Sequence, residues 1–323
     1  MDLHPTYPIF PIIIFLSFVA TLLPLAWIKR DNTGLLLLVL WLAIACLNQF
    51  INSVIWHGNT RNFVPVWCDI SSRLIVGISV GIPCSALCMT RRLYHVCSMK
   101  ALLLTTIQKR RALVEDMCIC VGIPFLQVVI HYVVGGHRYA ILEDIGCYPA
   151  TYNSWLAYVL AYSWPVIIGF LNGIYSVLTI RAIIRSGKEI DKCFEEKDEK
   201  KHYCRRIAFA LGMIIFDGPF AVVSMTFDLT TMPLYPYNGW KETHVNYSHV
   251  VNVPAAVWRL NPTWNAALEM ARWILILDTM VYYGIFGTSR EAINAYKKAF
   301  WTVIRVLGLK FRSSATFQDN LQL

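Results

Sequence analysis

Residues 34–56 read GLLLLVLWLAIACLNQFINSVIW, a stretch without a single charged side chain. A helix needs about 20 apolar residues to cross the hydrocarbon core of a bilayer. Six other stretches have comparable length and apolar character. The sequence therefore predicts an all-α membrane protein, a seven-transmembrane helix bundle with spans at residues 7–27, 34–56, 68–94, 117–134, 155–184, 207–232 and 263–286.

The composition favours lipid as the solvent of this chain. Of 323 residues, 56% are hydrophobic and only 15% are charged. The apolar residues run unbroken instead of recurring at the spacing of a half-buried helix or strand. The formal charge of +9 sits mostly in short loops, so it indicates membrane topology and not nucleic-acid binding. The ten cysteines lack metal-site spacing, and we expect no metal and no cofactor.

Positive charge is distributed unevenly among the loops. The segments after spans one, three, five and seven hold 23 of the 29 Lys and Arg residues. The positive-inside rule then places the N-terminus outside and the C-terminus in the cytosol. The first apolar run has no preceding Lys or Arg and no cleavage site, so we expect it to be retained as a span and not removed as a signal peptide.

The segment after span seven is amphipathic. Residues 289–307 place apolar side chains at helical spacing with basic residues between them, which predicts a helix lying along the membrane face. We expect residues 1–312 to form one membrane domain and residues 313–323 to form a disordered cytosolic tail.

Two cysteines and one sequon fall on the predicted outer side. Cys68 opens span three and Cys147 lies in the second outer loop, and the oxidising exterior permits a disulfide between them. Two free thiols are the alternative. Asn246, in the sequon Asn246-Tyr247-Ser248, is a candidate glycosylation site, although many sequons go unused.

Four segments resemble one family. They are Trp67–Ile70 at the start of span three, Ile141–Cys147 in the second outer loop, Tyr203–Ile207 before span six, and Phe286–Ala292, followed by Tyr296. In this order they resemble fungal mating pheromone receptors of the class D G-protein-coupled type, the branch for a-factor-type lipopeptides, especially its basidiomycete members. The similarity covers about residues 8–305. Span three ends Thr90-Arg91-Arg92-Leu93-Tyr94 and lacks the Asp-Arg-Tyr of the large animal receptor class.

The resemblance implies a function at the plasma membrane. The implied ligand is a short peptide mating pheromone that ends in a farnesylated, carboxyl-methylated cysteine. The implied output is nucleotide exchange on a heterotrimeric G protein upstream of a mating kinase cascade.

Ionisable residues in the outer third of the bundle are candidate ligand contacts. Arg73 lies in span three, Asp228 ends span six, and Glu269 and Arg272 lie near the start of span seven. Ionisable groups at such depth are functional candidates. The alternative is pairing on one helix face, between Asp69 and Arg73 at i,i+4 and between Glu269 and Arg272 at i,i+3.

The loop of residues 233–262 is rich in aromatic residues. Trp240 is the ligand-contact candidate in this loop, and its aromatic neighbours could form a lid over the bundle. Aromatic residues also gather at the membrane interface of proteins without any ligand, which is the alternative. The remaining aromatic and histidine residues of the loop are Tyr235, Tyr237, His244, Tyr247, His249 and Trp258.

Asp217 and Pro219 lie near the middle of span six. A carboxylate at that depth needs a partner or a proton, and proline bends a helix. Asn48, Asn52 and Asp278 are candidate partners at compatible depth. We hypothesise that Asp217 and Pro219 form an activation hinge; a static kink is the alternative.

Arginines cluster at the inner mouth of the predicted bundle. They could contact the G protein, or they could fix topology and bind anionic lipid. The candidates for coupling are Arg91, Arg92, Arg110, Arg111, Arg205 and Arg206.

Three other functions compete with a pheromone receptor. A transporter or channel would show inverted repeats or paired interrupted helices, which the sequence lacks. An intramembrane enzyme would need a catalytic set; His131 stands alone, and Asp217 and Asp278 match no known protease motif, so we predict no enzymatic activity. A ligand-independent receptor stays open. Gly169, Gly173 and Ser176 in span five could serve a homodimer or internal packing.

Overall fold

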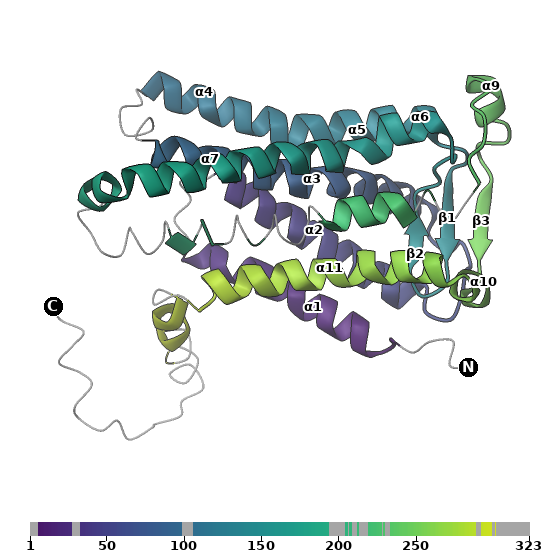
Figure 1. The fold of residues 1–323 in the computed structure, drawn as a ribbon. Helices are drawn as coiled ribbons and strands as arrows, with labels where there is room; N and C mark the ends of the chain where they lie inside the picture. The colour runs from purple at the N-terminus through teal and green to yellow at the C-terminus, as the bar shows by residue number, and fades with distance from the viewer. Residues whose placement is uncertain are drawn as a thin grey trace.

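The computed structural model describes residues 6–27, 33–98, 106–193, 204–205, 207–208, 212, 219–227, 229, 233–288, 292–298 and 301. Long helices lie side by side in a bundle, and a small β-sheet closes one end of it (Figure 1). We call this the sheet end, and the other the opposite end. The predicted tail, residues 313–323, lies outside the described residues.

Three long helices begin the chain. They are α1 (Ile9–Leu22), which a 3-10 turn extends over Leu23–Ala26, α2 (Thr33–Ile55) and α3 (Pro65–Cys97). Pro65 lies in the first turn of α3, where its fixed φ suits a helix and its missing N–H costs nothing.

Two further helical segments contain π-helical turns. The first comprises α4 (Thr106–Met117), the turn Cys118–Gly122, α5 (Ile123–His131) and a 3-10 turn at Tyr132–Val134. The second comprises α6 (Trp155–Ala157), the turn Tyr158–Tyr162 and α7 (Ser163–Cys193). Pro124 or Pro165 follows each π-turn within three residues. A proline removes a donor from the regular helical pattern, which favours such local rearrangement.

Five described segments are long and apolar enough to cross a membrane: Ile9–Ala26, Thr33–Ile55, Pro65–Cys97, Arg110–Val134 and Trp155–Arg185. The helix α11 (Pro262–Phe286) is 25 residues long and packs on α1, but it carries Glu269, Arg272 and Asp278. Half of predicted span six lies outside the described residues, and residues 219–227 are helical.

Several helices are longer than the predicted spans. The helix at the predicted span 117–134 already begins at Thr106, and α7 continues to Cys193 instead of ending at residue 184. An apolar run identifies only the part of a helix that suits hydrocarbon. The adjoining polar residues can continue the same helix, so the helix need not end where the apolar run ends. Residues 292–298 are also helical, within the predicted amphipathic segment, and the Tyr296 hydroxyl lies 2.9 Å from that of Tyr283 in α11.

Helix α3 packs against α2, α5 and α7. At its centre Trp41 of α2 joins three helices. The Trp41 indole donates a hydrogen bond to the Cys120 carbonyl in the first π-turn, at 3.0 Å. A Cβ on Gly81 of α3 would lie 2.5 Å from the Trp41 ring. Glycine at position 81 therefore makes room for the tryptophan that connects α2 to α3 and to the π-turn Cys118–Gly122.

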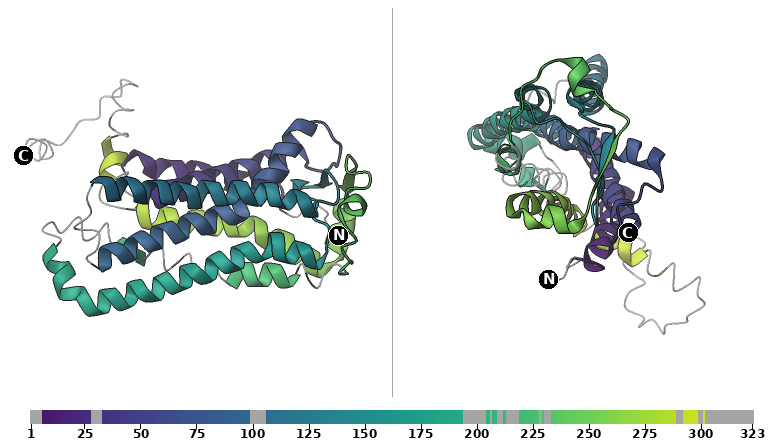
Figure 2. Two further views of the ribbon diagram at one scale, coloured as in Figure 1. Left: turned by 90° about the horizontal axis from the view of Figure 1, so that it is seen from above. Right: turned by 90° about the vertical axis from the view of Figure 1, so that its right-hand side faces the viewer.

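The sheet at the end of the bundle has the strand order β2-β1-β3. Strands β1 (Tyr139–Leu142) and β2 (Gly146–Tyr148) form an antiparallel hairpin, and β3 (Val250–Val253) pairs with β1 in parallel. The short helices α9 (Trp240–Thr243) and α10 (Ala255–Leu260) flank β3 (Figures 1 and 2). The sequence predicts only helices and loops here, because strands of three or four residues are too short to show an alternating pattern.

Candidate functional site

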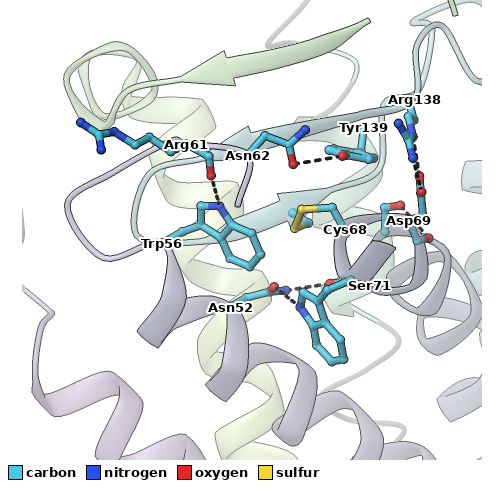
Figure 3. Close-up of a disulfide and its surroundings, with 12 residues drawn as sticks. Asn52, Trp56, Arg61, Asn62, Cys68, Asp69, Ser71, Arg138 and Tyr139 are labelled. Atoms are coloured by element: carbon cyan, nitrogen blue, oxygen red, sulfur yellow. Dashed lines mark hydrogen bonds and ion pairs between the residues drawn. A yellow bond between two sulfur atoms is a disulfide. The ribbon is translucent and has the colours of Figure 1, made fainter. Parts of the chain in front are cut away.

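A disulfide anchors the sheet to the helices. Cys68 in the first turns of α3 is bonded to Cys147 in β2 (Figure 3). Both cysteines are fully buried beside Trp56, Tyr139 and Ile141. The disulfide and this apolar cluster fix the hairpin over the ends of α2 and α3.

Polar contacts surround the disulfide (Figure 3). Asn52 of α2 donates to the Ser71 hydroxyl at 2.8 Å and accepts from the Trp67 indole at 3.0 Å. The Arg138 guanidinium donates to Asp69 at 2.8 Å. The predicted Asp69–Arg73 pair is therefore replaced, because the loop brings a better-placed cation to Asp69.

Gly146 is required by the same packing. Its φ is +91°, and a Cβ there would lie 2.6 Å from the Cβ of Asn52. Both the left-handed backbone and the close approach to α2 exclude other residues. The hairpin can thus lie directly on α2.

A buried ionic network lies at the sheet end beside the disulfide. Asp144, in the β1–β2 turn, is 3.2 Å from His57 and 3.8 Å from Arg259 of α10. Arg259 is 3.7 Å from Glu269 of α11, which accepts a hydrogen bond from Arg272 at 3.1 Å. The β1–β2 turn, the loop after α2 and the α10–α11 segment, which are distant from one another in the sequence, therefore meet through these contacts. Burial weakens solvent screening, so these charges interact more strongly than surface pairs.

Arg272 is the most enclosed member of this network. Its side chain is 3% exposed, and its guanidinium lies 3.9 Å from the centre of the Phe10 ring in α1. The predicted Glu269–Arg272 pairing is present. A small pocket adjoins Arg272, Asp144 and His57.

An aromatic cluster occupies another part of the sheet end. Trp240 of α9 stacks on His244 with ring centres 3.9 Å apart, and Tyr132 and Tyr247 lie against the same histidine. Arg73 of α3 donates to the Tyr247 hydroxyl at 2.7 Å. We call Arg73, Tyr132, Trp240, His244 and Tyr247 the aromatic cluster.

The sequence-predicted ligand candidates thus separate into two groups. Arg73 and Trp240 belong to the aromatic cluster, whereas Glu269 and Arg272 belong to the ionic network. Asp228 lies outside the described residues. Of the aromatic loop residues, Trp258 is fully buried and does not join the cluster. Sequence reasoning missed His57, Asp144 and Arg259, because three separate loops supply them and no spacing connects them.

Two loop residues have shifted pKa values. Burial, and then the neighbouring His249, lowers the pKa of His137 below its usual range. The hydrogen bond to Asp69 raises the pKa of Arg138. His137 therefore favours its neutral form in the folded protein.

The opposite end carries a second ionic contact. Arg91 of α3 donates to Asp116 of α4 at 2.8 Å and to Glu115 at 3.3 Å. The Asp116 side chain is 4% exposed. Arg111 also reaches Glu115, at 3.1 Å on an exposed helix face. Sequence reasoning missed both acidic partners, which follow the basic run of the same loop.

The remaining predicted residues belong to the proposed coupling group and to the predicted hinge. Arg92 is half-buried and Arg110 is exposed on α4; Arg205 is half-buried, and Arg206 lies outside the described residues. Of the predicted hinge, Pro219 is helical and exposed, whereas Asp217 lies outside the described residues.

Comparison with known proteins gives a consistent similarity. The family model described as pheromone A receptor matches residues 9–307. The pheromone B alpha 3 receptor of Schizophyllum commune is 38% identical over 313 residues, which cover 96% of this chain and 50% of the relative.

More distant relatives carry similar names. Pheromone receptor 1 of Mycosarcoma maydis is 29% identical over 295 residues, covering 90% of this chain and 82% of the relative. The pheromone a factor receptor of Saccharomyces cerevisiae is 25% identical over 282 residues, covering 85% and 58%. The chain spans about half the length of the Schizophyllum relatives that it matches.

Proposed function

Because this chain belongs to the pheromone A receptor family, we propose that it is a receptor for a mating pheromone that signals by activating a heterotrimeric G protein. The family match over residues 9–307 carries this proposal. The chain is a multi-pass membrane protein, and the plasma membrane is its expected location. We assign it no enzymatic activity, because the family is a class of receptors.

We propose seven spans, with the sheet end and the N-terminus outside the cell. The sixth span would comprise residues 207–232, and one membrane domain would comprise residues 1–312. Two observations support this orientation. Most Lys and Arg residues follow spans that lead away from the sheet end. The disulfide between Cys68 and Cys147 needs an oxidising compartment.

The ligand would be a peptide that ends in a farnesylated, carboxyl-methylated cysteine, and it would bind at the sheet end. Its apolar end would enter a crevice between helices, and its polar end would contact the loops. The contacts we propose are Arg73, Asp228, Trp240, Glu269 and Arg272.

The loop of residues 233–262 supports a role for this end in signalling. It carries Trp240 of the aromatic cluster, strand β3 and Arg259 of the ionic network. It also connects the proposed spans six and seven. A ligand that displaces this loop could therefore bias both helices, with Asp217 and Pro219 as the hinge in span six. Unchanged basal and pheromone-driven signalling in an Asp217→Asn variant would exclude the hinge.

The opposite end would face the G protein. The proposed coupling residues are Arg91, Arg92, Arg110, Arg111, Arg205 and Arg206. Replacing both Arg205 and Arg206 with Ala should lower coupling while the receptor still reaches the cell surface; unchanged signalling would count against this role.

Helix α7 is the proposed surface for a homodimer. Apart from the adjoining residues and backbone of α7 itself, no described atom lies within 4 Å of the position that a Cβ would take on Gly169 or Gly173. Small residues let helices approach closely in lipid. Replacing both glycines with Leu should reduce cross-linking between receptor copies, whereas unchanged cross-linking would exclude this surface.

The receptor function is tested in reporter yeast that lacks its own receptor. Cells expressing this chain are challenged with synthetic peptides ending in a farnesylated cysteine methyl ester, and with the same peptides without the prenyl group. We expect the prenylated peptides alone to induce the reporter at low concentration. Equal responses to both forms would contradict a lipopeptide ligand.

A further inference from the structure

The sequon Asn246-Tyr247-Ser248 lies on a turn at the rim of the sheet end, directly before β3. Asn246 has a φ of +54°, a left-handed conformation that asparagine tolerates in turns. Its carbonyl accepts a hydrogen bond from the His249 amide at 2.9 Å, which closes the turn.

The middle residue of the sequon is anchored inward. Tyr247 receives the hydrogen bond from Arg73 in α3, and its ring lies 5.1 Å from that of Tyr132. Asn246 and Ser248, on either side, are exposed. The fold therefore holds the turn by its central tyrosine and presents both the acceptor amide and the hydroxyl to solvent.

We propose that Asn246 carries an N-linked glycan. In this reaction the Asn246 amide nitrogen forms a bond to the anomeric carbon of an oligosaccharide. The bond from that carbon to the diphosphate of a lipid-linked donor breaks, and the amide gives up one proton. The inference rests on the proposed orientation, which places the sheet end in the compartment where such donors are used. The buried Cys68–Cys147 disulfide at the same end supports that compartment independently of the sequon.

The glycan would leave the ionic network uncovered. The turn lies on the α9 side of β3, whereas Arg259 belongs to α10 at the other end of the strand (Figure 1). Sugar on Asn246 would thus stand beside the aromatic cluster and away from Asp144 and Arg272.

The test uses the full chain expressed in yeast membranes, with electrophoretic mobility measured before and after treatment with a peptide N-glycosidase. We expect a shift for the unaltered chain and for Ser248→Thr, and no shift for Asn246→Gln or Ser248→Ala. Mass spectrometry should find aspartate at position 246 after enzyme treatment, because release of the glycan deamidates the asparagine.

A second sequon separates this inference from the proposed orientation. Gly58→Asn, made in the Asn246→Gln background, creates a sequon that ends at Thr60 in the loop after α2, also at the sheet end; Gly58 is exposed, and its φ of +62° is one that asparagine tolerates. A shift for this variant but not for the unaltered chain would overturn the glycan and leave the orientation standing. No shift in either chain would overturn the glycan and count against the orientation. A shift that persists in Asn246→Gln alone would also overturn the assignment.

Discussion

The carboxylate of Asp144 lies 3.8 Å from the guanidinium of Arg259, although the two residues belong to different loops. Asp144 sits in the β1–β2 turn, and Arg259 sits in α10, directly before α11. Through this contact and the Arg259–Glu269 contact, the hairpin that the disulfide holds on α3 is also connected to α11. The disulfide and the ionic contacts therefore connect the loops of the sheet end to both α3 and α11.

Replacing Asp144 with Asn should lower the stability of the folded protein. His57 and Arg259 would lose a buried anionic partner, which costs on the order of 1–3 kcal/mol in the free energy of unfolding. Thermal unfolding of the purified receptor measures the loss. Glu242→Gln, at an exposed acidic residue of α9, is the matched control and should change stability by less than about 0.5 kcal/mol. Equal melting temperatures for both variants would contradict the network.

Removing the disulfide should have a larger effect. Cys68 and Cys147 are separated by 79 residues, and losing such a cross-link typically costs roughly 2–5 kcal/mol. We expect Cys147→Ser to lower the melting temperature and surface expression. The control is Cys118→Ser at an exposed, unbridged cysteine, which should leave both unchanged. Normal stability of Cys147→Ser would show that the apolar cluster alone holds the hairpin.

Gly81→Ala tests the packing of Trp41 between α2, α3 and the π-turn Cys118–Gly122. The added methyl group would collide with the Trp41 ring, and such overpacking costs about 1–3 kcal/mol. Gly284→Ala in α11 meets no other part of the described chain within 4 Å, and alanine is the better helix former, so this control should be neutral or stabilising. The two variants are compared by thermal unfolding. Equal stability would contradict the close packing of the Trp41 ring against Gly81.

The Arg91–Asp116 contact is tested by a double-mutant cycle. With Arg91→Gln and Asp116→Asn, we expect a coupling energy of roughly 0.5–3 kcal/mol, because Asp116 is buried. The Arg111–Glu115 pair, whose arginine is 82% exposed, should give only about 0.3–0.5 kcal/mol in the same assay. Additive single effects at Arg91 and Asp116 would mean that the contact contributes nothing.

His137 predicts a loss of stability in acid. Its pKa is lowered in the folded state, so the unfolded chain takes up a proton at a higher pH than the folded chain. The stability it contributes is present above its ordinary pKa of about 6.5 and is lost as pH falls from there through the folded pKa. Unfolding temperatures at pH 7.5 and 5.5 should differ more for the unaltered protein than for His137→Gln. An identical difference would contradict this role.

The sequence predicts what a single helix or loop determines. Apolar runs locate five long described segments, because a span must match the hydrocarbon. The helix α11 begins at Pro262, one residue before the predicted start at Thr263. The charge distribution places Cys68 and Cys147 on one side, and the structure joins them. Neighbours on one helix, such as Glu269 and Arg272, also follow from spacing.

Contacts between segments that are distant in the sequence could not be predicted in this way. Asp69 pairs with Arg138 and not with Arg73, because the loop after α5 passes over the start of α3. The parallel pairing of β1 with β3 joins two loops more than 100 residues apart in the chain. Several helices also extend beyond their apolar runs. Hydropathy identifies the part of a helix that suits the membrane, whereas the helical hydrogen bonds continue into the polar residues beyond it.

Direct binding of a lipopeptide at the sheet end tests the central claim. The probes are radiolabelled synthetic peptides that end in a farnesylated cysteine methyl ester, applied to membranes containing the unaltered chain, Trp240→Ala or the control Glu242→Gln. We expect saturable binding that the unprenylated peptides do not displace, retained in Glu242→Gln and weakened at least tenfold in Trp240→Ala. Binding that is equally strong in all three proteins and is displaced equally well by the unprenylated peptides would contradict the account.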